Sequence, residues 1–282
     1  MLTRRAKESC FKLITATATG IVVALLALII GTIAYKGAGS LSWATITQAP
    51  KGDYYTGGGG GILNAILGSI YLGLGATLLA FVISLPTALY LRTYASRSKF
   101  ATLVRGLLDV LWGVPSIVFG AFGFTIMVWL GLRASLLAGI ITVAMFELPI
   151  MTRAIDVVMR MVPREIDEVS YSLGATRSET ALRAVVRQAQ PGIVTGVLLA
   201  FGRGIGDAAS VLFTAGFTDR IPHSLSQPAA TLPLAIFFQL GTPFDEVQKR
   251  AYGAALILIG IVLVTSVLSR ILSARLGRYV VK

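Results

Sequence analysis

Six long runs of apolar residues constrain this chain more than any other feature. The first run, residues 14–35, holds 22 residues without a charge, and about 20 apolar residues in a helix cross the hydrocarbon core of a membrane. The chain is 55% hydrophobic and only 13% charged, which is a membrane composition. We therefore predict an all-α integral membrane protein with a single transmembrane domain over residues 1–282. Its six helices are expected at about residues 14–35, 62–91, 108–132, 134–152, 192–216 and 251–269.

The distribution of basic residues predicts the orientation of the chain. Eighteen of the 25 Lys and Arg residues lie before the first run, after the second run, within residues 153–190 or in the tail, whereas six lie in the alternate connections. Basic residues accumulate in cytoplasmic loops, so we expect both termini and the 153–190 loop in the cytoplasm. A cleaved signal peptide is the alternative for the first run, but that run is longer than a typical signal sequence core.

Composition also excludes several classes of function. The net charge of +12 does not indicate a nucleic-acid partner, because the basic residues do not cluster with aromatic residues on one domain. One cysteine, Cys10, and one histidine, His223, argue against an internal disulfide, a cysteine metal cluster and histidine-based catalysis. No Gly-x-x-x-x-Gly-Lys-[Ser/Thr] motif occurs. We therefore expect no catalytic residue, metal or cofactor in this chain, and any ATP to be hydrolysed by another subunit.

Residues 153–190 are the most charged stretch, with 11 of the 38 charged residues of the chain. Pro163 suits the first position of a short helix, and Gly174 suits a left-handed stop after it. Thr176 to Glu179 forms a capping box for a second helix, which is expected to end before Pro191. The pattern predicts a helix, a glycine turn and a second helix, exposed to water between two membrane spans.

Arg203 lies 11 residues into the predicted helix at 192–216, where a buried Arg costs on the order of 2.5–3.5 kcal/mol. Asp207, four residues on, shares its helix face. The two could simply neutralise each other. Alternatively, Arg203 offers a donor fork for phosphate or carboxylate in a translocation path. In that case Asp207 holds the fork in place, and Ser210 and Thr214 add hydroxyl groups.

Four further features carry predictions. Glu147 is expected to pair with a basic group inside the bundle rather than to meet substrate. Gly57 to Gly61 is typical of a flexible linker. Residues 222–240 combine prolines with apolar side chains, which favours a short re-entrant helix. Small residues at four-residue spacing predict close packing against a partner helix rather than a pore; they are Gly192, Gly196, Ala200, Gly204 and Ala208.

The loop also resembles a known motif. Residues 168–174, Glu-Val-Ser-Tyr-Ser-Leu-Gly, are similar to the EAA signature of permease subunits of ABC importers, although Val169 and Ser170 replace its two alanines. The resemblance implies that this loop is a coupling helix that docks into a groove on a cytoplasmic ATPase. An ordinary amphipathic loop between two helices is the alternative. Under the first interpretation, the residues that couple to the ATPase are Glu168, Leu173, Gly174 and Ala175.

Over nearly its full length the chain resembles the PstA family, the permease subunits of phosphate-specific ABC importers. Arg203 corresponds to the intramembrane Arg of that family, and Asp207 stands where the family has Glu. The segments that carry the resemblance are Ile62–Ala65 after the glycine run, Val114–Val118, Leu148–Ile150 with Arg153, Leu173-Gly174, Gly192–Ala200 leading to Arg203, Gly206 and Asp207, Leu212–Ala215, Gln227-Pro228, Leu232-Pro233 and Ile236-Phe237.

The resemblance implies a MetI-like, six-helix type I ABC importer permease in the inner membrane of a prokaryote. It implies import of inorganic phosphate together with a homologous PstC-like permease, two PstB-like ATPase subunits that bind ATP and Mg²⁺, and a periplasmic or lipoprotein PstS-like binding protein. Import of another oxyanion, such as sulfate or phosphonate, is the alternative within the class. A secondary anion transporter is the alternative from another class, against which the helix–glycine–helix loop argues.

Overall fold

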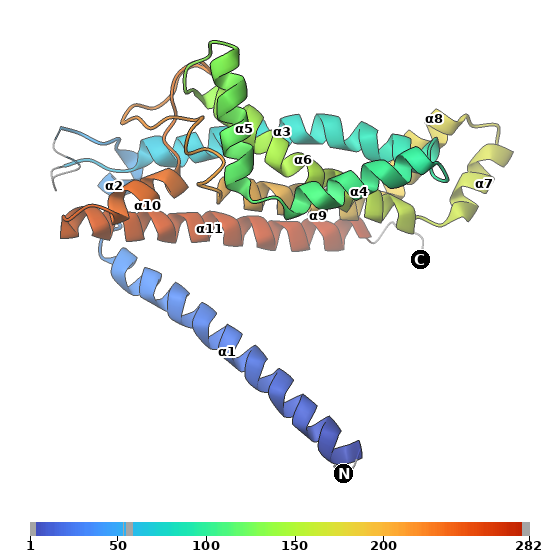
Figure 1. Ribbon diagram of the computed structural model, residues 1–282, viewed down its shortest axis with the longest axis horizontal. Coiled ribbons are helices and arrows are strands. Elements are labelled where there is room, and N and C mark those ends of the chain that lie inside the picture. The colour runs from blue at the N-terminus through green and yellow to red at the C-terminus, as the bar shows by residue number, and fades with distance from the viewer. Residues whose placement is uncertain (1–3, 53, 55–58, 278–282) are drawn as a thin grey trace.

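A computed structural model describes residues 4–52, 54 and 59–277. Regular structure in this part of the chain is helical, apart from an isolated β-bridge between Pro50 and Gly60. Most helices lie side by side along the long axis of the molecule, and α1 (Arg4–Ala38) leaves the bundle at an angle (Figure 1). The arrangement agrees with the expected all-helical fold.

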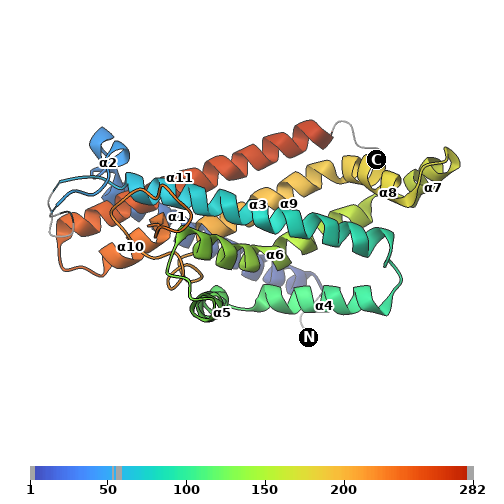
Figure 2. The ribbon, with the colours of Figure 1, turned by 90° about the horizontal axis from the view of Figure 1, so that it is seen from above.

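Three long helices form the centre of the bundle: α3 (Leu63–Thr93), α6 (Leu136–Met161) and α9 (Val186–Ile205), with α11 (Asp245–Leu276) packed along α9. Figure 2 shows α11 and α4 (Lys99–Gly113) on opposite sides of the bundle, with α3, α6 and α9 between them. The core is apolar and fully buried; it includes Leu72, Ala80, Val143, Met151, Ile155 and Ala200. Because α6 contacts α3, α4, α5 and α9, it is the helix around which the others are arranged.

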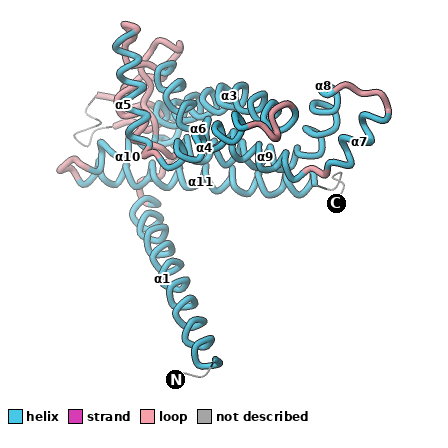
Figure 3. The backbone as a smooth tube through the Cα atoms, turned by 45° about the vertical axis from the view of Figure 1, so that its right-hand side comes forward, coloured by secondary structure: helices cyan, strands magenta, loops and turns pink. Residues whose placement is uncertain are grey.

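Five helices within the described residues are long and apolar enough to cross a membrane, and there are six if a bent pair counts as one span. The bent pair is α4 with α5 (Ser116–Trp129), which meet at 102° (Figure 3). The expectation of one continuous helix at 108–132 is therefore wrong. Val114 is extended, with φ −70° and ψ 130°, because the ring of Pro115 disfavours the helical conformation in the residue before it.

The predicted helix at 192–216 is also wrong at both ends. A continuous helix begins at Arg177, comprises α8 (Arg177–Glu179), a π-helical segment η2 (Thr180–Val185) and α9, and runs through Pro191 to Ile205. Residues 206–216 form turns instead of helix. Backbone hydrogen bonds hold these turns in place: Ser135 N donates to Thr214 O at 2.9 Å, and Ala229 N donates to Ala215 O at 2.9 Å. These tertiary contacts compete with the helical bonds that the apolar pattern alone would favour.

Helix α1 makes contact with the rest of the chain at its C-terminal end. The ammonium of Lys36 lies 5.0 Å from the ring centroid of Tyr252 on α11, and a Cβ atom at Gly37 would collide with the Tyr252 backbone. The apolar stretch of α1 is exposed throughout, with none of it buried inside this chain. Lipid or another protein must therefore cover it.

One end of the bundle carries long loops and two short helices, α2 (Trp43–Thr47) and α10 (Leu232–Leu240). Helix α10 is the short helix expected within residues 222–240. Its Leu232 and Leu234 are fully buried, and Leu232 N donates to Ser69 Oγ on α3 at 2.7 Å. Much of the apolar character of this segment thus belongs to the core of the protein.

The structure describes Gly59 to Gly61 of the glycine run. Gly57 and Gly58 lie outside the described residues. Gly60 has φ +113°, which favours glycine, and a Cβ atom at Gly61 would collide with backbone carbonyl groups of Ala44, Thr45 and Gln48. This part of the run is packed against the chain around α2, so the expectation of a plain flexible linker is wrong there.

Candidate translocation site and coupling loop

Arg203 lies in the last turn of α9 and is exposed on the surface of the bundle. Its guanidinium carbon is 5.0 Å from the ring centroid of Phe146 on α6. A guanidinium at this distance is attracted to the ring by a cation–π interaction. Among the ion pairs of the described residues, none includes Arg203. The contact leaves its N–H donors free for a ligand.

Asp207 does not hold Arg203. Because α9 ends at Ile205, the two residues do not share a helical face, and they form no ion pair. Asp207 Oδ2 instead accepts a hydrogen bond from Ser210 N at 2.8 Å, which closes a turn beyond the helix. Both expectations for the pair, mutual neutralisation and support of the guanidinium fork, are therefore wrong in this structure.

Ser210 and Thr214 are fully buried. Thr214 Oγ1 donates to Ser210 O at 3.3 Å, and within the described part of the chain the Ser210 hydroxyl has no hydrogen-bond partner. The structure therefore brings the four predicted path residues to one break after α9, where Arg203 is exposed, Asp207 is half-buried, and Ser210 and Thr214 are buried.

Glu147 occupies the position next to Phe146 on α6 and is fully buried. Neither oxygen of its carboxylate has a hydrogen-bond partner among the described residues, and it takes part in no ion pair there. The expected pairing with a basic group is wrong. A Cβ atom at Gly204 would collide with Glu147 Oε1, so the carboxylate packs directly against the backbone of α9, one residue from Arg203.

The small residues of α9 pack against α6, as predicted. Cβ atoms at Gly192 and Gly196 would meet Val158 and Ala154 of α6, and one at Gly204 would meet Glu147. Ala200 is fully buried. Ala208 lies beyond the helix end. The stripe is thus a packing surface that brings the backbones of two central helices together.

A buried charge cluster, which sequence reasoning missed, joins α4 to α6. The carboxylate of Asp156 is fully buried and binds Arg105 through two contacts, at 2.9 Å to Nε and 3.0 Å to Nη2. Arg153 reaches the same carboxylate at 3.3 Å and Asp109 at 2.8 Å. Asp156 follows Arg153 by three residues, which is the one local signal that could have indicated this cluster.

The predicted glycine turn and capping box are both confirmed. Helix α7 (Arg164–Ser172) ends before Gly174, which has φ +83°. Thr176 N donates to Glu179 Oε2 at 2.9 Å, and Glu179 N donates to Thr176 Oγ1 at 3.3 Å. These bonds start the helix that continues to Arg203.

Helix α7 has no buried residue. Leu173 is 83% exposed and Val169 60% exposed. Two polar contacts attach the loop to the rest of the chain: Arg92 Nη1 lies 2.8 Å from Asp167 Oδ2, and the hydroxyls of Ser170 and Thr180 are 2.8 Å apart. Of the four predicted coupling residues, Glu168, Leu173 and Gly174 are exposed and Ala175 is half-buried. The loop thus presents apolar side chains outward at the end of the bundle.

Comparison with known proteins places this architecture in a family. Residues 80–280 match the sequence model of the binding-protein-dependent transport system inner membrane component family. Over 240 residues the chain is 33% identical to the phosphate transport system permease protein PstA of Yersinia pestis, which covers 85% of this chain and 81% of that protein. The chain belongs to the PstA family.

Other members of the PstA family show similar likeness. PstA of Haemophilus influenzae is 31% identical over 243 residues, covering 86% of this chain and 85% of its own length. PstA 1 of Mycobacterium tuberculosis is 36% identical over 209 residues, covering 72% of this chain and 67% of its own length.

The fold matches a solved ABC transporter. An inward-facing crystal structure of the MetNI methionine transporter contains a chain with a TM-score of 0.63 and 17% identity, covering 76% of this chain and 95% of that one. The PstA-family chain therefore has the MetI-like permease fold that the sequence predicts. It is a multi-pass inner-membrane component of an ABC transporter, and it is not the catalytic subunit.

Proposed function

We propose that this chain is the transmembrane permease subunit of an ATP-driven importer of inorganic phosphate. The observation that carries the proposal is Arg203, which is exposed at the end of α9 and, within the described residues, not paired with a carboxylate. The planar fork of Arg donates two parallel hydrogen bonds to an oxyanion. Membership of the PstA family makes phosphate the oxyanion of choice.

The ring of Phe146 supports this role for Arg203. A guanidinium that stacks on an aromatic face keeps its in-plane donors available. A carboxylate in the same place would compete with the anion for those donors. Asp207, which instead caps the turn after α9, supports the site by holding the break in the helix.

The full complex is proposed to hold two ATPase subunits, one for each permease. The exposed loop around α7 is proposed to dock on one of them. Leu173 supplies an apolar contact, Glu168 a charge, and Gly174 with Ala175 the turn between helices. ATP and Mg²⁺ are bound by the ATPase, which is PstB-like. Closure of the ATPase pair would then be transmitted to the bundle through this loop.

Further partners follow from other exposed surfaces. The free apolar side of α1 and the open face around Arg203 are proposed to meet a homologous PstC-like permease and lipid. At the other end, exposed Leu225 and Phe237 are proposed to face a periplasmic or lipoprotein phosphate-binding protein of the PstS kind. The excess of basic residues near α7 supports an orientation with both termini in the cytoplasm.

Uptake of labelled phosphate in cells without other phosphate importers tests the proposal. Arg203→Gln should abolish uptake while membrane abundance and co-purification of the ATPase stay normal. Arg203→Lys should recover little, because an ammonium does not reproduce the planar fork. Arg133→Gln is the matched control, since Arg133 is also exposed but lies in a turn between α5 and α6, and it should transport normally.

Two further arms separate the alternatives. Asp207→Asn keeps an oxygen that can accept from Ser210 N, so it should retain most uptake, and the double variant with Arg203→Gln should be as inactive as Arg203→Gln alone. Substantial uptake by the double variant would contradict the role of Arg203. Competition by unlabelled sulfate or phosphonate as strong as that by phosphate would assign a different oxyanion.

A further inference from the structure

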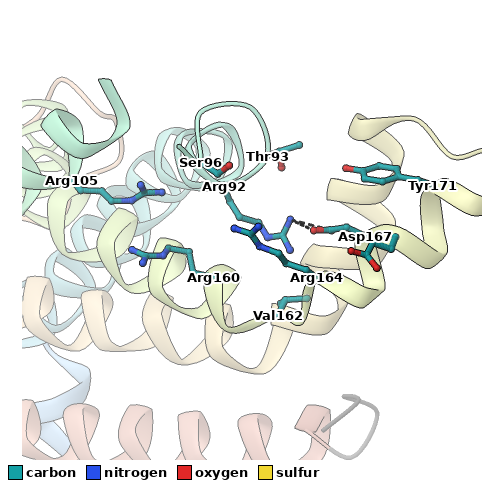
Figure 4. Close-up of a pocket in the computed structure, with 10 residues that line it drawn as sticks. Arg92, Thr93, Ser96, Arg105, Arg160, Val162, Arg164, Asp167 and Tyr171 are labelled. Atoms are coloured by element: carbon teal, nitrogen blue, oxygen red, sulfur yellow. Dashed lines mark hydrogen bonds and ion pairs between the residues drawn. The ribbon is translucent and has the colours of Figure 1, made fainter. Parts of the chain in front are cut away.

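A second basic site, separate from Arg203, lies at the end of the bundle that carries α7. A cavity of about 500 Å³ opens there between α3, α4, α6 and α7. Its lining includes four arginines, Arg92, Arg105, Arg160 and Arg164, and two carboxylates, Asp167 and Glu168 (Figure 4). Positive charge is therefore in excess on its walls.

The arginines of this cavity are not equivalent. Arg92 is paired with Asp167 at 2.8 Å, and Arg105 is paired with the buried Asp156 at 2.9 Å. Arg160 and Arg164 have no carboxylate partner among the described residues and are exposed. Two donor forks in one cavity are thus available for a ligand.

The forks also lie close to other cations. Figure 4 shows the side chains of Arg92 and Arg164 converging in the cavity, with Arg105 and Arg160 on its other side. Like charges that share a site repel one another, and an anion between them removes that repulsion. An arrangement of this kind is more stable with a bound anion than without one.

Hydroxyl groups complete the lining. Thr93 Oγ1 is buried and lacks a hydrogen-bond partner in the described part of the chain, although Thr93 lines the cavity. Ser96 and Tyr171 add two more hydroxyls. Guanidinium forks combined with hydroxyl donors are suited to a tetrahedral oxyanion.

We propose that this cavity is a binding site for a phosphate group. Free inorganic phosphate and the headgroup phosphate of an anionic lipid share the chemistry that it recognises. If the occupant is free phosphate, the site lies on the side where the proposed importer releases its substrate, and that assignment rests on the proposed function and orientation. The phosphate group would bridge Arg164 of α7 to Arg160 of α6, and so fix the coupling loop to the bundle.

Binding is measured on the complete transporter in nanodiscs of phosphatidylcholine, in the Arg203→Gln background so that the transport site does not contribute. Radiolabelled inorganic phosphate is the first probe. Saturable binding is expected, and Arg160→Gln and Arg164→Gln should each weaken it roughly tenfold or more, as for the loss of one charge-assisted hydrogen bond. Arg97→Gln is the matched control, because Arg97 is exposed on the nearby α3–α4 turn but does not line the cavity.

The second probe is phosphatidylglycerol, added to the nanodiscs and detected as retained lipid by native mass spectrometry. Retention that falls in the Arg160 and Arg164 variants but not in Arg97→Gln would assign the lipid headgroup. The proposal would be overturned if both probes bound equally to all variants. It would also be overturned if an ATPase side chain filled the cavity in the complete transporter, so that neither probe bound there. If Arg164→Gln disturbs assembly, Arg160→Gln carries the same test.

A site for phosphate here does not depend on phosphate import. If Arg203→Gln leaves uptake intact while Arg160→Gln abolishes binding, the proposed role of Arg203 fails and the cavity remains. If uptake requires Arg203 but neither probe responds to Arg160 or Arg164, the cavity fails and the importer remains.

Discussion

At the scale of single residues, the carboxylate of Glu147 lies where a Cβ atom at Gly204 would otherwise be. The carboxylate packs on the α9 backbone with no hydrogen-bond partner in the described part of the molecule. Burying a carboxylate in this way is unfavourable unless its surroundings are tailored to it. The glycine supplies that space, since any side chain would displace the carboxylate.

Gly204→Ala is therefore expected to destabilise the protein by about 1–3 kcal/mol, as overpacking of a dense core does. Gly202→Ala is the matched control, because a Cβ atom there meets nothing within 4 Å. In a helix interior that control should be neutral or stabilising by about 0.5–1 kcal/mol. Thermal unfolding of the purified complex measures both changes. Adding Glu147→Ala should restore part of the loss in Gly204→Ala, and equal melting of the two glycine variants would refute the contact.

The sequence indicated functional charged residues more readily than the residues with which they pair. Arg203 was recognisable as a charge in an apolar run, but its relation to Asp207 was inferred from four-residue spacing, which holds only inside a helix. Once α9 ends at Ile205, the inference fails. Asp156 was missed because it lies in a charged stretch, where one more charge does not stand out. Its burial depends on Arg105 from another helix.

At the scale of elements, local signals predicted the coupling loop well. The glycine turn and the capping box each involve residues within four positions of one another, so the sequence contains all the information they need. Prolines were less reliable. Pro115 was expected inside a helix and instead ends one, whereas Pro191 was expected after a helix and lies inside one. The ring of Pro115 disfavours the helical conformation at Val114, whereas the helix continues through Pro191 in a segment that packs against α6.

Gly174→Val tests the turn. A β-branched residue at φ +83° is strained by roughly 1–2 kcal/mol, so α7 should lose its fixed relation to α8. The expected result is weaker co-purification of the ATPase, or ATP hydrolysis without uptake. Gly106→Val is the control, since Gly106 lies in α4 with open space around its Cβ position. Normal coupling in Gly174→Val would remove the loop from the coupling path.

At the scale of the whole molecule, hydropathy predicted long apolar helices but not their arrangement. The helix pair α4–α5 shows this, because length and composition alone allow one span where the chain turns by 102°. The detachment of α1 could not be predicted either. A run of apolar residues has the same pattern whether its own chain, lipid or another subunit covers it.

The orientation of the molecule is open to a direct test. Reporter fusions at the C-terminus and within residues 217–231 should give opposite signals, with the C-terminus inside the cell, because the basic residues gather at the end that carries α7 and the C-terminus of α11. A fusion within the α7–α8 turn should match the C-terminal one. An external signal from the C-terminus would reverse the assignment of every loop.

The unbroken helix from Arg177 to Ile205 has a mechanical consequence. At about 1.5 Å per residue it measures roughly 40 Å, with the capping box at one tip and Arg203 at the other. Under the roles proposed for the α7 loop and Arg203, this helix would act as a lever arm, because a tilt imposed beside Gly174 would displace the guanidinium at its other end. The proposed anion-binding group and the proposed point of contact with the ATPase would then be the two ends of one helix.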